Sequence, residues 1–336
     1  MSIEFSPIVE SDIIGIRALM RTAFQVQSDA PFLNVDLLRW KYIEPRPDWE
    51  GSRGFVFRQG DKILAHCGLA PVRFMMPGNE ISAVCFMDWA ASSSIPGIGG
   101  LLLRRLMKMG DIAVVAGGTA DTWAAIPKLG FVRHADLLHY VRVVRPWNIF
   151  QEKSSEPSWK RIARLLRYTA REIISPNTVP AGWELKPITR FEAEPWQNMP
   201  SERYVAIRRD AELLNYWLRC PLAKFSGFLV LHNGRVCGHV LINKLRKQAR
   251  IVDVRLNRED PAAWQAAYAL ATRQAMSTPE IVEVRAIASA PLAQFALNKN
   301  GFHKSYQASI FLYDPRKILD SQPLHWNFID DDSALI

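Results

Sequence analysis

The sequence predicts a mixed α/β (α+β) fold that is built twice along the chain. Three blocks recur in the same order, with offsets of 171 to 176 residues. The paired blocks are DLLRWKY (36–42) with ELLNYWL (212–218), FVFRQGDKILAHCG (55–68) with FLVLHNGRVCGHVL (228–241), and VVAGGTADTWAAIPKLGF (114–131) with EVRAIASAPLAQFALNKNGF (283–302). Because the order is kept and the offsets drift by only a few residues, we interpret the chain as two copies of one domain.

Each copy has the pattern of a mixed sheet covered by helices. In the first copy a helix begins after Ser11 or Asp12, and a second helix carries the LLRW block. A hairpin, a third strand, a helix, a strand, a short helix closed by Gly130 and a final strand (131–145) follow. The second copy repeats the hairpin with the turn HNGR, and Asn-Gly between β-rich arms is a strong hairpin signal. The order α, α, β, β, β, α, β, α, β predicts helices on both faces of each sheet.

The pattern divides the chain into four segments. They are a first domain (1–145), a linker with an amphipathic helix (146–180), a second, degenerate domain (181–314) and a C-terminal tail (315–336). The linker helix has Trp159, Ile162, Leu166 and Ile173 on one side and basic residues on another. We favour a crossover helix that docks on the body of the protein and exposes its basic face. A membrane surface or an acidic partner is the alternative.

Composition limits the class of protein. The chain has 336 residues, 49% of them hydrophobic, and a formal net charge of +9, which favours an acidic ligand or surface. No zinc-finger, helix-turn-helix or RNP-like pattern indicates a specific nucleic acid. No run of 18 apolar residues predicts a transmembrane helix, and the N-terminus is unlike a secretory signal, so we expect a cytoplasmic protein. The four cysteines lack metal-site spacing, so we expect reduced thiols and no metal centre.

The segment SIPGIGGLLLRRL (94–106) is typical of an anion-binding turn. It follows the apolar run AVCFMDWA and leads directly into a helix, so bare backbone amides and the helix dipole would face a phosphate. A dinucleotide fingerprint needs a third glycine where Leu102 stands, and it needs an acidic residue about 20 positions later, which is missing. A P-loop needs Gly-Lys-Ser/Thr, which is also missing.

This segment resembles motif A of the GNAT (Gcn5-related N-acetyltransferase) superfamily, in which Arg/Gln-x-x-Gly-x-Gly/Ala follows the fourth strand and opens a helix. Ser94 stands where Arg or Gln is usual, and IPKLGF (126–131) resembles the close of motif B. The resemblance covers 1–145 and, through the repeat, 181–314. It implies two tandem GNAT-like domains that use acetyl-CoA or another acyl-CoA as co-substrate. The CoA-binding residues that it implies are Trp89, Ala90, Gly97, Ile98, Gly99, Gly100 and Leu101.

The second copy lacks the glycine-rich turn. Gly97 lies nine residues after Asp88, whereas the residue nine positions after Asp253 is Ala262. The neighbouring Glu259 and Asp260 would repel a pyrophosphate. We therefore expect the first copy alone to bind coenzyme A and the second to shape the acceptor site.

Asp88 is the candidate catalytic residue, because it is a carboxylate in an otherwise apolar strand and such a group can serve as a general base. A structural aspartate that bonds to nearby backbone is the alternative, and Asp253 in the degenerate copy supports it. The tyrosine acid that is usual in the superfamily is replaced by Ile126. Water, or one of the remaining proton-carrying groups, would then protonate the thiolate. Those groups are His66, His134, His139 and Tyr140.

The predicted function is an acyl-CoA-dependent N-acyltransferase that acylates, and in particular acetylates, an amine of a small molecule or an amino sugar. We expect a monomer or a homodimer. The alternative is a non-catalytic CoA-binding or scaffold protein of GNAT fold, which the missing tyrosine favours. A third hypothesis, an aminoacyl-tRNA-dependent transferase on a related double fold, would not need the motif A glycines, and they are present.

Overall fold

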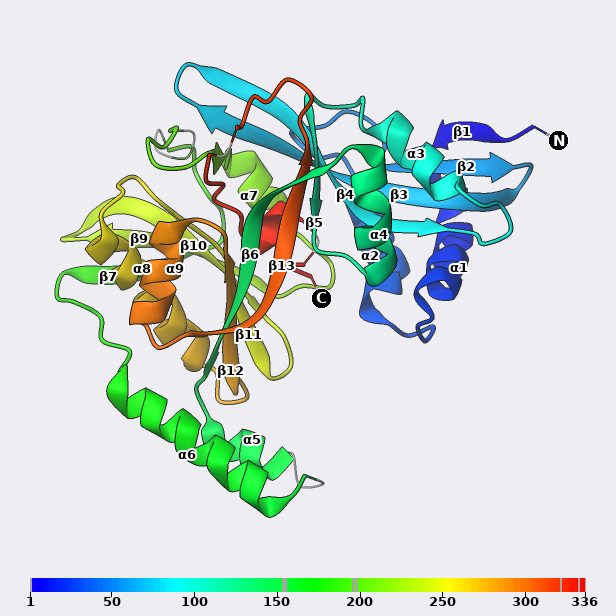
Figure 1. Ribbon diagram of the computed structural model, residues 1–336. Helices are drawn as coiled ribbons and strands as arrows, with labels where there is room; N and C mark the ends of the chain where they lie inside the picture. Colours follow the sequence, from blue (N-terminus) through cyan, green and yellow to red (C-terminus); the bar gives the residue numbers. More distant parts are fainter. Residues whose placement is uncertain are drawn as a thin grey trace.

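The computed structural model describes residues 2–152, 156–194, 197, 199–320, 322–331 and 333–335. From residues 35 and 211 onward the two halves run through the same order of strands and helices (Figure 1). The first half contains β1 (Glu4–Pro7), α1 (Ile13–Phe24), α2 (Val35–Tyr42), β2 (Gly54–Gln59), β3 (Lys62–Met76), β4 (Asn79–Ala91), α3 (Ile98–Leu106), β5 (Ile112–Ala116), α4 (Ala120–Ala125) and β6 (Val132–Val143). The second contains β7 (Trp183–Ile188), β8 (Ala206–Ile207), α7 (Ala211–Leu218), β9 (Phe225–His232), β10 (Arg235–Lys244), β11 (Gln248–Leu256), α8 (Pro261–Met276), β12 (Glu283–Ala288), α9 (Pro291–Lys299) and β13 (His303–Tyr313).

The strands of both halves join one mixed sheet. In the described residues its order is β1-β2-β3-β4-β5-β13-β6-β12-β11-β10-β9-β7, with β8 paired to β3. The last strand of each half therefore crosses over: β13 lies beside β5, and β6 lies beside β12. The predicted mixed α/β class is confirmed. The sequence missed β1 and this exchange of final strands, because a crossover of chain between two similar sheets leaves no local signal.

Helices cover both faces of the first half of the sheet. Phe55 and Phe57 of β2 belong to a cluster with α3, whereas Val56 between them packs with α1 and α2. This is the alternation that a strand with two covered faces requires. The turn of the second hairpin has Asn233 and Gly234 at φ of 50° and 75°, as a two-residue hairpin turn demands.

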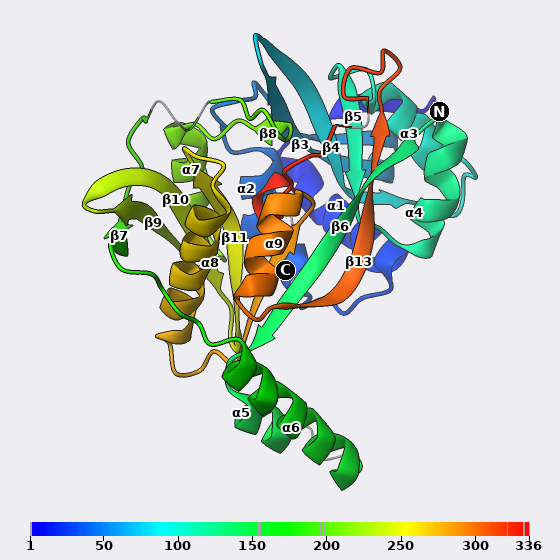
Figure 2. The ribbon, with the colours of Figure 1, turned by 60° about the vertical axis from the view of Figure 1, so that its left-hand side comes forward.

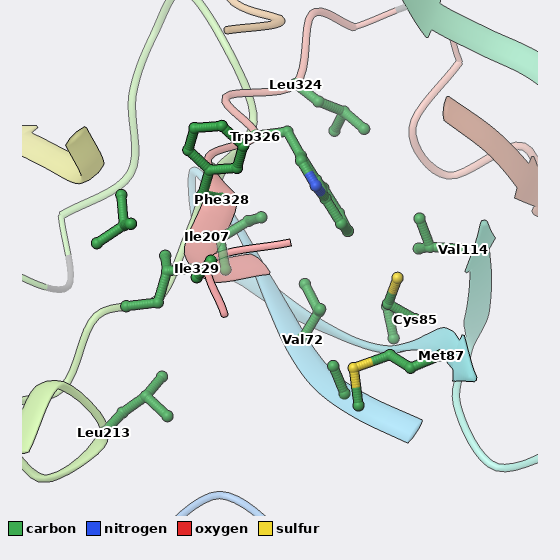
Figure 3. Packing of buried hydrophobic residues seen from close by; sticks show 14 of the residues in the cluster. Val72, Cys85, Met87, Val114, Ile207, Leu213, Leu324, Trp326, Phe328 and Ile329 are labelled. Atoms are coloured by element: carbon green, nitrogen blue, oxygen red, sulfur yellow. The ribbon is translucent and has the colours of Figure 1, made fainter. Parts of the chain in front are cut away.

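The largest cluster of buried side chains lies between the halves and includes the end of the chain. Trp326, which is fully buried, and Phe328 pack with Cys85 and Met87 of β4 (Figure 3). The segment after β13, which the sequence indicated as a tail, is therefore part of the core. At the same interface Trp40 and Tyr216, which occupy equivalent positions of the two copies, stack with ring centroids 4.4 Å apart.

The linker between the halves forms a helical hairpin that projects from the body. Helices α5 (Pro146–Glu152) and α6 (Ser158–Ile174) run side by side away from the sheet (Figures 1 and 2). No described side chain of α6 is buried. The expectation that this helix docks along the body is therefore wrong, because only its C-terminal end meets the body, where Glu172 pairs with Arg142.

Candidate functional site

Strands β4 and β5 diverge and open a pocket between them. They pair in parallel over three positions, which end at Cys85 opposite Val114. Beyond these residues a pocket of about 300 Å³ opens. Its walls come from β4, β5, α3, the turn before α4 and the α1–α2 region, namely Phe86, Met87, Asp88, Trp89, Leu103, Val115, Ala116, Gly117, Gly118, Thr119, Thr122, Phe24 and Phe32. A pocket with mostly apolar walls and one carboxylate suits a small reacting group.

A β-bulge on β4 places Asp88 in the wall of this pocket. The pairing of β3 with β4 shifts register between His66 and Gly68, and Asp88 has a φ of 49°. The extra residue changes the direction of the side chains that follow. Trp89 packs beneath α3, where its Nε1 donates to the carbonyl of Gly99 at 3.2 Å, while the Asp88 carboxylate meets α2 on the other face. Asp88 and Trp89 thus lie in the same bulge, and their side chains contact helices on opposite faces of the sheet.

The Asp88 carboxylate is held by two side chains of α2. Its Oδ2 atom accepts from the Lys41 ammonium and from the Tyr42 hydroxyl. The Lys41 and Asp88 side chains are only 3% and 7% exposed, so the two opposite charges of this pair are withdrawn from water together. Among the described residues, Oδ1 of Asp88 has no hydrogen-bond partner. Gly68 makes room for this arrangement, because a Cβ there would lie 2.4 Å from the Tyr42 ring.

The sequence analysis did not single out Lys41 and Tyr42. A signal for them was present in the repeat, since the equivalent positions of the second copy hold Trp217 and Leu218. A charged and a hydroxyl side chain that replace two apolar ones in otherwise similar helices indicate a local polar requirement.

His66 is a neutral structural neighbour of this group. It is fully buried, and its Nδ1 lies 3.2 Å from the Asp88 carbonyl oxygen. Burial lowers the pKa of His66 to about 3, and the charge of Lys41 contributes to this. A histidine that stays neutral at pH 7 is not available as an acid for a leaving thiolate. Burial also raises the pKa of the adjacent Cys67 thiol, so that thiol is not a nucleophile.

The glycine-rich turn begins α3 on the side of the sheet that Trp89 faces. Gly97 caps the helix with a φ of 82°, and a Cβ there or at Gly100 would meet open space or a contact no closer than 4.0 Å. In contrast, a Cβ at Gly99 would lie 2.9 Å from Trp89, so this glycine is needed for packing. In the described chain, the amides of Gly99 and Gly100 donate to no carbonyl of the preceding turn.

The other predicted CoA-binding positions have mixed surroundings. Ala90 and Ile98 are buried, in clusters on opposite faces of β4, and Leu101 is 54% exposed. Of the predicted CoA-binding residues, only Trp89 lines the pocket. Asp88, the predicted catalytic residue, lines it as well. Backbone amides, not these side chains, are therefore what the turn offers a ligand.

None of the described residues that line the pocket replaces the tyrosine that serves as the general acid in the superfamily. Ile126 is fully buried against the α3 face of the sheet. His134, His139 and Tyr140 lie on β6, which β13 separates from β5, and none of them lines the pocket. Thr119 accepts from the amide of Thr122 and so caps α4. No group of three or more metal-ligating side chains occurs in the described part of the chain.

Comparison with solved structures identifies the fold. No family model matches the chain, and no curated protein matches it in sequence. Among similar solved structures, a GCN5-related N-acetyltransferase from Anabaena variabilis superposes with a TM-score of 0.61 at 11% identity, over 93% of this chain and 72% of that one. The N-myristoyltransferase of Saccharomyces cerevisiae with bound myristoyl-CoA gives 0.58 at 14%, over 93% and 83%. A tandem GNAT protein of the clavulanic acid pathway gives 0.55 at 13%, over 93% and 98%.

The chain thus has the GNAT fold, and the resemblance that motif A and the Gly-Phe close suggested is confirmed at the level of the fold. The tandem protein matches along nearly all of both chains, so the arrangement of the two halves is also shared.

Proposed function

We propose that this chain transfers an acyl group from a coenzyme A thioester to an amine, and that the first half carries the reaction. The observation that supports this most strongly is the pocket at the divergence of β4 and β5. It combines a bulge, a carboxylate and a glycine-led helix within one half of the molecule. The solved structures of similar fold include acetyltransferases and a myristoyltransferase with its acyl-CoA bound.

The amides at the start of α3 would bind the pyrophosphate of the CoA substrate. Gly97 and Gly100 leave space for it. The amides of Gly99 and Gly100, which no described carbonyl of the preceding turn accepts from, lie at a helix N-terminus, and such a position favours an anion. The pantetheine arm would then run toward the bulge, where a backbone amide of Trp89 or Ala90 would donate to the thioester carbonyl.

Asp88 would receive the proton of the incoming amine through Oδ1, the oxygen that α2 leaves unbonded. Lys41 keeps the carboxylate in place. The amine nitrogen attacks the carbonyl carbon, the C–S bond breaks, and the electron pair leaves with the thiolate. The proton given up by the amine returns to the thiolate sulfur through water, because the pocket offers no tyrosine for this step.

Titration of the protein with acetyl-CoA and longer acyl-CoAs by calorimetry tests the binding half of this proposal. We expect one site per chain. Gly100→Glu should weaken binding at least about tenfold, while Gly100→Gln, which is matched in size but uncharged, should weaken it far less. Release of free thiol in the presence of a panel of amines tests the chemical half. Absence of CoA binding would overturn the proposal.

The second candidate is a CoA-binding protein without transferase activity. Ile126 in place of the acid, and the internal pairing of Asp88 with Lys41, favour it. The same two measurements separate the candidates, because this protein would bind acyl-CoA but release no thiol with any amine.

A further inference from the structure

The α5–α6 hairpin contacts the body only at its base. Arg142 forms a bidentate pair with Glu172 near the C-terminal end of α6, and the Tyr168 ring lies 6.0 Å from that of His303. Beyond this base the hairpin extends away from both halves (Figures 1 and 2). It also lies far along the chain from the residues of the proposed acyl-transfer site, so a function for it does not depend on that proposal.

The outward side of α6 carries a continuous apolar surface, here called the outward stripe: Trp159, Ile162, Leu166 and Ile173. These residues are spaced three, four and seven apart and therefore share one side of the helix. Their exposed fractions are 68%, 49%, 65% and 75%. The opposite side, with Leu165 and Tyr168, is half-buried.

The hairpin has further exposed apolar side chains where the chain enters it and where the chain leaves it. Ile174 at the end of α6 is 77% exposed, and Trp147 at the start of α5 is 56% exposed and stacks on Phe150. Water is a poor solvent for so large an apolar surface, and a contiguous patch of this kind marks an interaction site.

Basic side chains border the outward stripe. Helix α6 has five basic residues and one acidic residue, a net charge of +4. Two of the basic residues are fixed: Arg164 pairs with Glu156, and Arg161 donates to the Phe150 carbonyl. Lys160 and Arg167 lie exposed beside the stripe, so their long side chains can reach groups in the surface on which the stripe rests.

We propose that the α5–α6 hairpin docks this protein on an anionic lipid surface, with the outward stripe inserted at the level of the headgroups. A helix with an apolar side, a basic border, low overall hydropathy and a tryptophan near its N-terminus is suited to the membrane interface. Charge complementarity selects this occupant. A second copy of the hairpin would bring two helices of charge +4 together, and a nucleic acid backbone would leave the apolar stripe in water. No helix of the described residues is long and apolar enough to cross a membrane.

Flotation of the full chain with lipid vesicles tests the proposal. We expect the protein to float with phosphatidylcholine vesicles that contain phosphatidylglycerol and to stay in solution with phosphatidylcholine alone. The double variant Ile162→Ser/Leu166→Ser should lower binding at least about tenfold. Lys160→Glu/Arg167→Glu should lower it by a similar factor and make it insensitive to salt. Ile14→Ser, which changes an isoleucine on α1 that is 63% exposed, is the matched control and should bind like the parent chain.

Three results would overturn the proposal. The first is failure of the parent chain to bind anionic vesicles. The second is equal binding by the Ile162→Ser/Leu166→Ser variant. The third is a dimer of the parent chain in sedimentation, without lipid, that this variant converts to a monomer, because the stripe would then belong to an interface between copies. Thermal unfolding checks that each variant is folded. All variants should unfold at the same temperature as the parent chain, because the substituted side chains are exposed.

Discussion

In the first half of the molecule β4 ends beside an open pocket, whereas in the second half β11 ends beneath the chain's own C-terminal segment. Within the described residues, Asp88 keeps one oxygen unbonded and lines that pocket. Asp253 is 1% exposed and is bonded by Arg209, His239 and Asn327 at 2.7 to 3.0 Å. Two similar strands thus carry an aspartate toward either an open pocket or a closed network.

The helices that follow these strands differ in the same way. Helix α3 begins with glycines whose amides remain available. Helix α8 begins at Pro261, and the Asp260 carboxylate accepts from the amide of Ala262. The second half satisfies its helix N-terminus with its own side chain, and it satisfies the end of its strand with Asn327 and His325. The comparison teaches that the same strand-to-helix arrangement stays open or is closed according to which of its polar groups other parts of the chain bond.

The largest difference between the two halves is expected when their equivalent aspartates are substituted and the activity is measured. Asp88→Asn removes the proposed proton acceptor but keeps the shape of the side chain, so kcat/KM should fall about 10²–10⁴-fold while the affinity for acyl-CoA changes little. Asp253→Asn is the matched variant in the second half. It should lower the melting temperature and leave the activity per folded molecule nearly intact. Steady-state kinetics of both proteins at one pH decide the matter, and unchanged activity in Asp88→Asn would exclude Asp88 as the base.

The closed network of the second half should dominate stability. Arg209 lies between Asp253, at 3.0 Å, and Asp330, at 2.6 Å, and all three are buried. Arg209→Met leaves two buried carboxylates without a cation, so the free energy of unfolding should fall by about 3–5 kcal/mol. The neighbouring Arg208 is about one-third exposed, and Arg208→Met should cost no more than about 1 kcal/mol. Urea unfolding measures the free energy of unfolding of both variants. Similar losses would show that the burial of Arg209 does not determine the size of the effect.

The equivalent histidines should differ in their response to acid. His66 has a carbonyl partner and a pKa lowered to about 3 by burial, so the folded state keeps it neutral while the unfolded chain protonates near pH 6.5. Stability is therefore lost as pH falls below about 6.5, by about 2 kcal/mol at pH 5. Burial also lowers the pKa of His239, but Asp253 opposes the shift. Urea unfolding at pH 7.5 and pH 5 should show that His66→Gln loses less stability on acidification than the parent chain. An identical loss would contradict this.

The smallest effect concerns the helix caps. Thr119 caps α4 with its side chain, whereas the equivalent residue of the second half, Ala290, gives α9 no side-chain cap. Thr119→Ala should lower the free energy of unfolding by about 1 kcal/mol. The reverse change, Ala290→Ser, should raise it by a similar or smaller amount. Chemical denaturation of the two single variants and their combination measures the difference, and additive values would confirm that the two caps act independently.

Much of the local structure could be predicted from the sequence. The hairpin turns, the strands on both sides of each hairpin and the glycine-led helix α3 all follow from turn residues and alternation. These signals are local, since a glycine with positive φ acts within a few positions. The repeat extended the prediction to the second half, and the absence of glycines at 259–262 predicted that the second half lacks the glycine-rich turn of the first.

The sequence by itself determined the mixed α/β class, the repetition of the fold and the position of Asp88 beside a glycine-rich turn, because each depends on residues close together in the chain. Only the tertiary structure decided which groups meet. It brings Lys41 and Tyr42 to Asp88, exchanges β6 and β13 between the halves, buries Trp326 at their interface and leaves α6 undocked. Such contacts join segments tens to hundreds of residues apart. Their outcome depends on the summed packing and pairing of many groups, which no single segment of the sequence records.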